Sequence, residues 1–149
     1  ARNEIHRQNV SDEYLLSDDE TDARLGIYFY EGGAAPRKPR IVYDRRNTSV
    51  YKMKADEFPE EMFTSARCFH TCGITLALDE KVRETAVTLM RKFKEHGTLI
   101  SFDVNFRGNL WSGEEARKCI EEILPLVDIF FCSDSTARLT FQKKGHRKK

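Results

Sequence analysis

Three short apolar runs alternate with two segments of helical period between residues 68 and 132, and this alternation restricts the possible folds most. The apolar runs cover 68–71, 99–104 and 128–132. Between them, over 79–97 and 112–125, apolar residues recur every three or four positions, as they do on the buried face of a helix. Strand–helix–strand crossovers are right-handed in nearly all known proteins, so the three strands are expected to be parallel neighbours in an α/β core.

The ends of the two predicted helices carry their own signals. Asp79 is a good N-cap for the first helix, and Gly97 ends it. Ser112, followed three residues later by Glu115, forms a capping box for the second helix, which ends near Pro125. The last apolar run, 128–132, carries almost no polar residue and therefore predicts a strand that is covered on both faces.

The N-terminal half has a different pattern. Short runs of β-forming residues at 25–30, 41–43 and 49–51 are separated by glycines, prolines and an asparagine. They predict a small antiparallel β flap, which buries little by itself and should rest on another domain or subunit. We therefore divide the chain into a helix remnant with an acidic connector (1–22), a β lid (23–53), a partial α/β core (54–142) and a basic tail (143–149).

Composition excludes several classes of protein. The 25 lysines and arginines nearly balance the 24 acidic residues, so no overall charge attracts nucleic acid or an anionic membrane. The basic tail is interpreted as a solvated terminus rather than a nucleic-acid site. No apolar run approaches the roughly 20 residues of a membrane helix, and the N-terminus has no apolar core of a secretion signal. We expect a cytoplasmic protein that does not enter membranes.

The cysteines agree with that location. They lie within apolar segments, which favours buried thiols in a reducing compartment over disulfides; they are Cys68, Cys72, Cys119 and Cys132. Two of them alternate with His70 on one strand face. A zinc site needs a fourth ligand and usually a loop between its cysteines, so we favour buried thiols around a hydrogen-bonded histidine and predict no metal site there.

A strand that leads into a polar cluster is the strongest candidate for a ligand site. The run 99–104 is followed by Asn105 and Arg107, and Asp103 lies near its end. In open α/β sheets, ligands collect beyond the carboxyl ends of the strands. A guanidinium there can hold a carboxylate or phosphate through two parallel hydrogen bonds. The alternative is an ion pair of Arg107 with Asp103 or a neighbouring acid that merely closes the loop.

Two other segments offer weaker candidates. Strand periodicity places Tyr43 and Arg45 on one face of the flap, with Tyr28 on a neighbouring strand. They either contact a ligand or pack across strands. Gly73 follows the first core strand, where it would allow a ligand to approach the backbone or simply permit a tight turn.

Four segments, in this order and at this spacing, resemble those of the ribokinase/PfkB family, most closely the 2-keto-3-deoxygluconate kinases. These segments are 25–28, 42–45, 69–78 and 103–111, the last reading Asp-x-Asn-x-Arg-x-x-Leu-Trp. The resemblance implies a ribokinase-like parallel sheet with crossover helices and a small antiparallel β lid. It also implies a carbohydrate kinase that uses ATP and Mg2+ to phosphorylate a sugar or sugar acid.

The resemblance further implies roles for individual residues. The substrate-binding positions would be Tyr28, Tyr43, Arg45, Gly73, Ile74 and Arg107. Gly73 and Ile74 would line the sugar pocket through their backbone, and Arg107 would hold the substrate near the transferred phosphate. Ser133 would lie on the ATP side, and the lid would join copies of the chain in a homo-oligomer.

Two departures from the family pattern limit these expectations. The family has Asn-x-x-Glu where this chain has Ser-Asp-Ser-Thr at 133–136, and the Gly-Ala-Gly-Asp motif that carries the catalytic base has no counterpart. We therefore assign no catalytic residue and expect a central fragment that is inactive in isolation. The alternative is a non-catalytic truncated kinase that acts as a sugar-acid-binding or subunit-interaction module.

Overall fold

The computed structural model describes residues 2–141, and the chain divides into two compact units, Ala1–Met53 and Lys54–Lys149. The basic tail predicted at 143–149 lies outside the described residues. Among the described residues, no helix combines the length and the apolar character that crossing a membrane requires.

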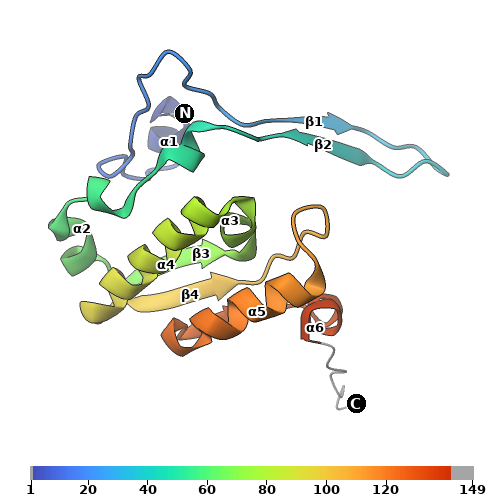
Figure 1. Ribbon diagram of the computed structural model, residues 1–149. Coiled ribbons are helices and arrows are strands. Elements are labelled where there is room, and N and C mark those ends of the chain that lie inside the picture. Colours follow the sequence, from blue (N-terminus) through green and yellow to red (C-terminus); the bar gives the residue numbers. More distant parts are fainter. Residues whose placement is uncertain (1, 142–149) are drawn as a thin grey trace. The chain divides into compact units, whose positions relative to one another are not determined.

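The first unit contains a long β-hairpin, shown in blue and teal in Figure 1. After helix α1 (Arg2–Arg7), strands β1 (Ile27–Glu31) and β2 (Arg40–Asp44) pair antiparallel, with Ile27 opposite Asp44. All residues of both strands are exposed within the chain. The predicted antiparallel β element is therefore present as a two-stranded sheet.

The third strand predicted for the flap, at 49–51, is wrong. That segment forms the short 3-10 helix η1 (Ser49–Lys52). Asn47 has a φ of 53°, which turns the backbone away from the extended path of β2. The amide of Tyr51 then donates to the carbonyl of Thr48 (2.9 Å), so the β-forming residues close a helical turn instead of a ladder.

The second unit is built on a parallel sheet whose strand order is β3-β4-β5. The strands are β3 (Cys68–Cys72), β4 (Leu99–Asp103) and β5 (Ile129–Phe131), joined by helices α4 (Glu80–Glu95) and α5 (Gly113–Ile123). This is the α/β arrangement that the sequence predicts. The shorter elements are η2 (Ala55–Glu57), α2 (Glu60–Ser65), α3 (Gly73–Leu78), η3 (Leu124–Leu126) and α6 (Asp134–Phe141).

Both crossover helices begin where the caps predict. The Asp79 carboxylate accepts from the Lys81 amide (2.8 Å), and Gly97 follows α4 with a φ of 77°. At α5, the Ser112 hydroxyl accepts from the Glu115 amide (3.2 Å) while the Glu115 carboxylate accepts from the Ser112 amide (2.7 Å). The capping box is therefore complete, and it lowers the pKa of Glu115 because its carboxylate accepts the Ser112 amide.

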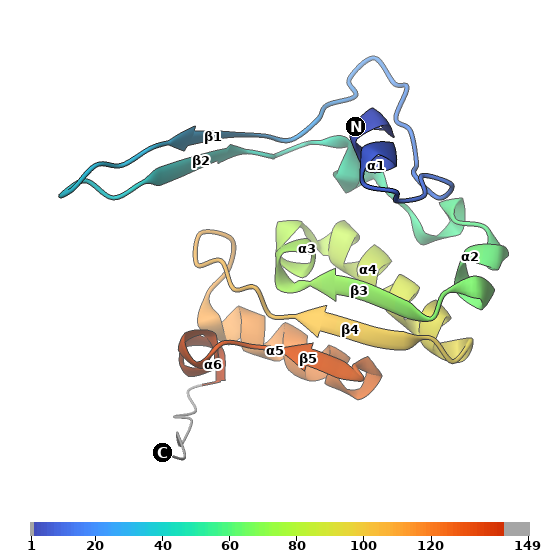
Figure 2. The same cartoon turned by 180° about the vertical axis from the view of Figure 1, so that it is seen from behind.

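Among residues 54–141 the sheet is covered on one face only, so the prediction that the last strand is covered on both faces is wrong within this unit. Successive strands advance in one direction, and two right-handed crossovers then place α4 and α5 on the same side. Figure 2 shows the strands in front of these helices. Ile100 and Phe102 face the helices and are fully buried, whereas Leu99 and Phe131 are 49% and 53% exposed.

The core lies between the sheet and its helices. It combines α4 and α5 side chains with those of β4 and with Phe63 of α2; its fully buried members include Phe63, Leu76, Met90, Ile100, Phe102, Val104 and Ile120. Rings join the layers: Phe69 of β3 stacks on Phe93 of α4 at a centroid distance of 4.5 Å. This packing holds the carboxyl ends of the strands in place.

Asp128 ties the start of β5 to its neighbours. Its carboxylate accepts from the Ile100 amide (2.8 Å) and from the Lys94 ammonium (2.5 Å), and its own amide donates to the Ile100 carbonyl (2.9 Å). The Ile100 hydrogen bond and the Lys94 charge lower the pKa of the Asp128 carboxyl. The side chain therefore stays charged and fixes the register between β4 and β5.

The cysteines differ from expectation. All four are free, but only Cys119 is buried, Cys72 and Cys132 are half-buried, and Cys68 is exposed. The reason is the open face of the sheet, onto which Cys68 and Cys72 project from β3. His70 is hydrogen-bonded as predicted, through its Nδ1 to the Ser101 hydroxyl (2.9 Å), but buried thiols do not surround it.

Candidate functional site

Three strand ends lie side by side at one edge of the parallel sheet. Cys72 of β3 is in register with Asp103 of β4, and Asp103 with Phe131 of β5. The chain after each of these residues carries a predicted site residue: Gly73, Arg107 and Ser133 follow β3, β4 and β5 respectively. The carboxyl edge of a parallel sheet is where α/β proteins bind ligands, so it is the candidate site of the second unit.

Only glycine fits at position 73, because the backbone of β4 leaves no room for a side chain. A Cβ atom at this residue would lie 2.1 Å from the Val104 carbonyl oxygen, well inside contact distance. The glycine therefore lets the end of β3 pack directly against the end of β4 and opens α3 at that point. Ile74 follows it and is half-buried. Close backbone packing thus explains Gly73, and a ligand contact stays a prediction.

The segment after β4 makes a tight, self-bonded turn. The Asp103 carboxylate accepts from the Asn105 amide (2.9 Å), and Asn105 has a φ of 35°. The Val104 amide donates to the Phe131 carbonyl (3.0 Å), which anchors the turn to β5. Asx turns of this kind use the carboxylate to fix the backbone, so Asp103 shapes the loop that carries the arginine.

Arg107 is half-buried, and its Nη1 donates to the neighbouring Phe106 carbonyl (3.0 Å). No ion pair between Arg107 and Asp103 occurs among the ion pairs of residues 2–141. The loop is therefore not closed by an ion pair between Arg107 and Asp103. A guanidinium carries five N–H donors in a planar fork, which suits a carboxylate or a phosphate.

Ser133 has a structural role. Its hydroxyl accepts from the Thr136 amide (3.2 Å), which caps α6, and it donates to the Thr136 hydroxyl (2.9 Å). It also lies 3.0 Å from the Ser135 hydroxyl. The hydroxyls of 133–136 thus bond to one another and to the helix end.

A pair of carboxylates at this edge was missed in the sequence. Burial raises the pKa of the Cys132 thiol first, and the charges of Asp103 and Asp134 raise it further. The charges of both carboxylates thus act on the same thiol, although the two residues are far apart in the chain. Asp103 ends β4 and Asp134 begins α6 shortly after β5, so only the pairing of these two strands places both at this edge.

The oxygen donors at this edge bear on the magnesium that the resemblance implies. Magnesium prefers oxygen ligands and is usually held by one or two carboxylates together with phosphate oxygens. Asp103 and Asp134 are the carboxylates that the ends of β4 and α6 offer at this edge. Residues 2–141 contain no group of three or more His, Cys, Asp or Glu side chains that could hold a metal by itself.

The hairpin of the first unit brings its three candidates together. Tyr28 and Tyr43 are directly opposite in the ladder, with ring centroids 6.3 Å apart. The Arg45 guanidinium carbon lies 4.7 Å from the centre of the Tyr43 ring. Cross-strand packing of these side chains is therefore present, and a ligand role stays a prediction. The Arg45 Nη2 is buried and has no hydrogen-bond partner within the described chain.

Comparison with protein families and curated proteins gives consistent matches. The family model described as pfkB family carbohydrate kinase matches residues 1–149. The chain is 38% identical over 132 residues to the 2-dehydro-3-deoxygalactonokinase of Haloferax volcanii, covering 89% of this chain and 41% of that protein. It is 30% identical over 94 residues to the 2-dehydro-3-deoxygluconokinase of Bacillus subtilis, covering 62% of this chain and 29% of that protein.

Solved structures match the fold as well. A PfkB family carbohydrate kinase from Listeria grayi gives a TM-score of 0.85 at 32% identity, covering 99% of this chain and 46% of that one. An uncharacterized sugar kinase from Pyrococcus horikoshii in complex with ATP gives 0.79 at 25%, covering 94% and 45%. These matches confirm the predicted ribokinase-like fold. The chain spans less than half of each of these relatives.

Proposed function

The chain belongs to the pfkB family of carbohydrate kinases, and on that premise we propose that it serves ATP-dependent phosphorylation of a sugar acid, 2-keto-3-deoxygluconate or a close relative. It would do so as a central fragment that lacks the catalytic-base motif. The observation that carries the proposal is the carboxyl edge of the sheet, where Gly73, the Asp103–Arg107 turn and the end of β5 meet. The names of the relatives from Haloferax volcanii and Bacillus subtilis support the substrate class.

Charge supports an acidic sugar over a neutral one. Some relatives are named as probable fructokinases, so the family alone does not choose the substrate. Arg45 presents a buried guanidinium nitrogen without a partner among the described residues, and a buried donor of this kind is costly unless an acceptor meets it. A substrate carboxylate would be such an acceptor, and a neutral sugar would supply only hydroxyls.

Phosphoryl transfer depends mainly on positioning and on stabilising negative charge. Bound ATP would supply the phosphoryl group and Mg2+ would neutralise its charge, with Asp103 and Asp134 as the residues that would hold the metal. Arg107 would orient an anionic oxygen near the transferred group, and Gly73 would leave its backbone accessible to the sugar. We assign no base to this chain, so it should bind substrate without turning it over.

Arg107→Lys should weaken binding of 2-keto-3-deoxygluconate to the purified chain by about tenfold or more. Lysine keeps the positive charge but cannot form two parallel hydrogen bonds to one oxyanion, and a charge-assisted hydrogen bond contributes roughly 1.5–3 kcal/mol. Isothermal titration calorimetry of the wild-type and variant chains measures the difference.

The unfolding midpoint in urea serves as the control for Arg107→Lys, since a half-buried surface side chain should barely change it. Equal affinity of the two chains for the sugar acid would rule out a bidentate role. Wild-type chain that binds no sugar acid at millimolar concentration would refute the proposed substrate.

A second candidate function is a non-catalytic truncated kinase that binds a sugar acid or a partner subunit. The observation in its favour is the segment 133–136, whose hydroxyls are engaged with one another and with the end of α6. In the calorimeter, sugar-acid binding without any ATP binding in the presence of Mg2+ would select this candidate.

We also propose a cytoplasmic location. The four free cysteines of the chain suit a reducing compartment and support it.

We also propose that the hairpin joins two copies of the chain. The face opposite Tyr28 and Tyr43 carries exposed Ile27, Phe29 and Val42, and monomeric proteins rarely expose such a strip. Phe29→Glu should therefore shift a concentration-dependent dimer to monomer in sedimentation velocity, since it places a charge in the strip.

Val10→Glu is the matched control for Phe29→Glu, because Val10 is also more than half exposed (55% against 63%) but lies outside the hairpin. A wild-type chain that sediments as a monomer up to about 100 μM would contradict the dimer, since weak homodimers associate in this range of concentration.

A further inference from the structure

The two stems of the hairpin stay joined below the β1–β2 ladder. The Arg24 amide donates to the Ser49 hydroxyl (3.2 Å), while the Ser49 hydroxyl and amide both donate to the Arg24 carbonyl (3.2 and 2.9 Å). These bonds link the segment before β1 to η1, the short helix after β2. The two segments therefore stay paired beyond the end of the β1–β2 ladder, through these hydrogen bonds between Arg24 and Ser49.

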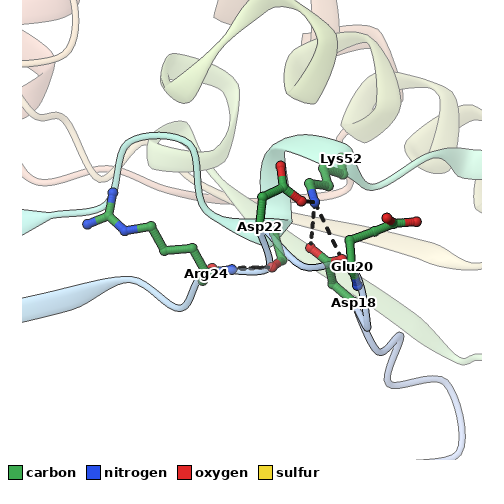
Figure 3. A network of polar contacts seen from close by, with 6 residues as sticks. Asp18, Glu20, Asp22, Arg24 and Lys52 are labelled. Atoms are coloured by element: carbon green, nitrogen blue, oxygen red, sulfur yellow. Dashed lines mark hydrogen bonds and ion pairs between the residues drawn. The ribbon is translucent and has the colours of Figure 1, made fainter.

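Lys52 adds a charged contact next to this pairing. Figure 3 shows its ammonium group between the carboxylates of Asp18 and Asp22. The Nζ atom lies 2.5 Å from an Asp22 oxygen and 3.2 Å from an Asp18 oxygen. The Asp18 side chain is only 15% exposed, whereas that of Asp22 is 76% exposed, so solvent screens the ion pair with Asp18 less than the one with Asp22.

Both charges are stabilised where they lie. The Ser49 side chain first, and then the Lys52 ammonium group, lower the pKa of the Asp18 carboxyl against the opposing effect of desolvation. Asp22 and Asp18 raise the pKa of Lys52. The Asp18 carboxylate and the Lys52 ammonium group therefore remain ionised together around neutral pH.

Arg24 extends the contact toward the strands. Figure 3 shows its guanidinium directed away from Lys52, where it donates to the Arg46 carbonyl (2.8 Å) and pairs with Asp44, the last residue of β2. We call Asp18, Asp22, Arg24, Ser49 and Lys52 together the stem clasp. Arg24 thus contacts the residues on both sides of Arg45, the carboxylate of Asp44 and the carbonyl of Arg46.

We propose that Lys52 is a positioning residue that keeps the stem of the hairpin closed and thereby fixes the face formed by Tyr28, Tyr43 and Arg45. An isolated two-stranded ribbon is marginally stable in water, and every residue of β1 and β2 is exposed within the chain. Pinning the stems shortens the segment that is free to move and lowers the entropy lost when the ladder forms. The consequence for ligand binding rests on the proposed function; the closure of the stem does not.

Amide hydrogen exchange of the whole chain tests the closure. Lys52→Met keeps the length of the side chain and removes its charge, so we expect exchange across β1, β2 and the Arg24 and Ser49 amides to accelerate about three- to tenfold. Lys52→Arg should restore most of the protection. Lys81→Met, at an exposed lysine of α4, is the matched control and should leave these amides unchanged.

The outcomes separate the two layers of the proposal. Unchanged exchange in Lys52→Met, or ladder amides that are already unprotected in the wild-type chain, would overturn the clasp. Calorimetry with 2-keto-3-deoxygluconate should show an affinity loss in Lys52→Met of at most the factor by which exchange accelerates, since the apparent dissociation constant rises as the fraction of chains with an ordered face falls. Accelerated exchange with unchanged affinity would refute the positioning role. Absence of sugar-acid binding in the wild-type chain would refute the proposed function while exchange still decides the clasp.

Discussion

Gly73→Ala should destabilise the second unit by about 3 kcal/mol, the upper part of the usual range for overpacking a buried site. The added Cβ would meet the Val104 carbonyl oxygen at 2.1 Å, so either β4 or the start of α3 must move. That carbonyl belongs to the backbone at the end of the central strand and cannot rotate aside as a side chain would. Urea denaturation followed by tryptophan fluorescence measures the change.

The fluorescence reports on the right unit. Trp111 is the only tryptophan of the chain, and it is 7% exposed in the core of the second unit. Gly108→Ala is the control, since its Cβ would meet only the Phe106 ring at an ordinary 3.6 Å. Equal midpoints for the two variants would show that β3 and β4 do not approach each other as closely as the structure has them.

Phe102→Ala should cost about 3–5 kcal/mol, the range for truncating a buried phenylalanine. Phe102 is fully buried on the helix-covered face of the central strand, so alanine leaves a cavity that the layers around it cannot close. The same urea experiment measures the loss of unfolding free energy.

Phe131→Ala is the matched variant on the open face, where the side chain is 53% exposed. This variant should lower the free energy of unfolding by less than about 1.5 kcal/mol, because folding buries little of the apolar surface of Phe131. A cost for Phe131→Ala close to that of Phe102→Ala would mean that β5 is covered on both faces, as its sequence alone suggests.

The core helices could be predicted because their signals are local. The Asp79 cap and the Ser112–Glu115 capping box lie within a few residues of the helix ends that they fix. The conformation of the segment 49–51 could not be predicted in the same way, because it depends on a hydrogen-bond partner that is distant in the sequence. Ser49 bonds to Arg24, which lies 25 residues earlier, and this bond favours a helical turn.

The covered face of the sheet was within reach of sequence reasoning, since two right-handed crossovers in one direction must fall on one side. The apolar composition of 128–132 predicts cover on both faces, and the exposed side chains of β5 show that composition alone does not decide it.

The candidate site was predictable in part. Arg107 stands out because a polar cluster follows an apolar strand, and the structure places it at the expected edge of the sheet. The Ser133 cap had a local signal too, since a serine precedes a helix with a threonine three residues on. The placement of Asp134 at the same edge of the sheet as Asp103 depends on strand register and has no trace in the local sequence. Whether the sugar-acid roles hold is decided by the binding experiments.

The outer edge of β5 has a consequence for handling the protein in solution. This strand is apolar on both sides, and among the described residues its only ladder partner is β4. Unpaired backbone groups along such a strand act as a template on which another chain can add. The chain should therefore aggregate as its concentration rises, at temperatures below those that unfold it. A charged residue on this edge should reduce that aggregation.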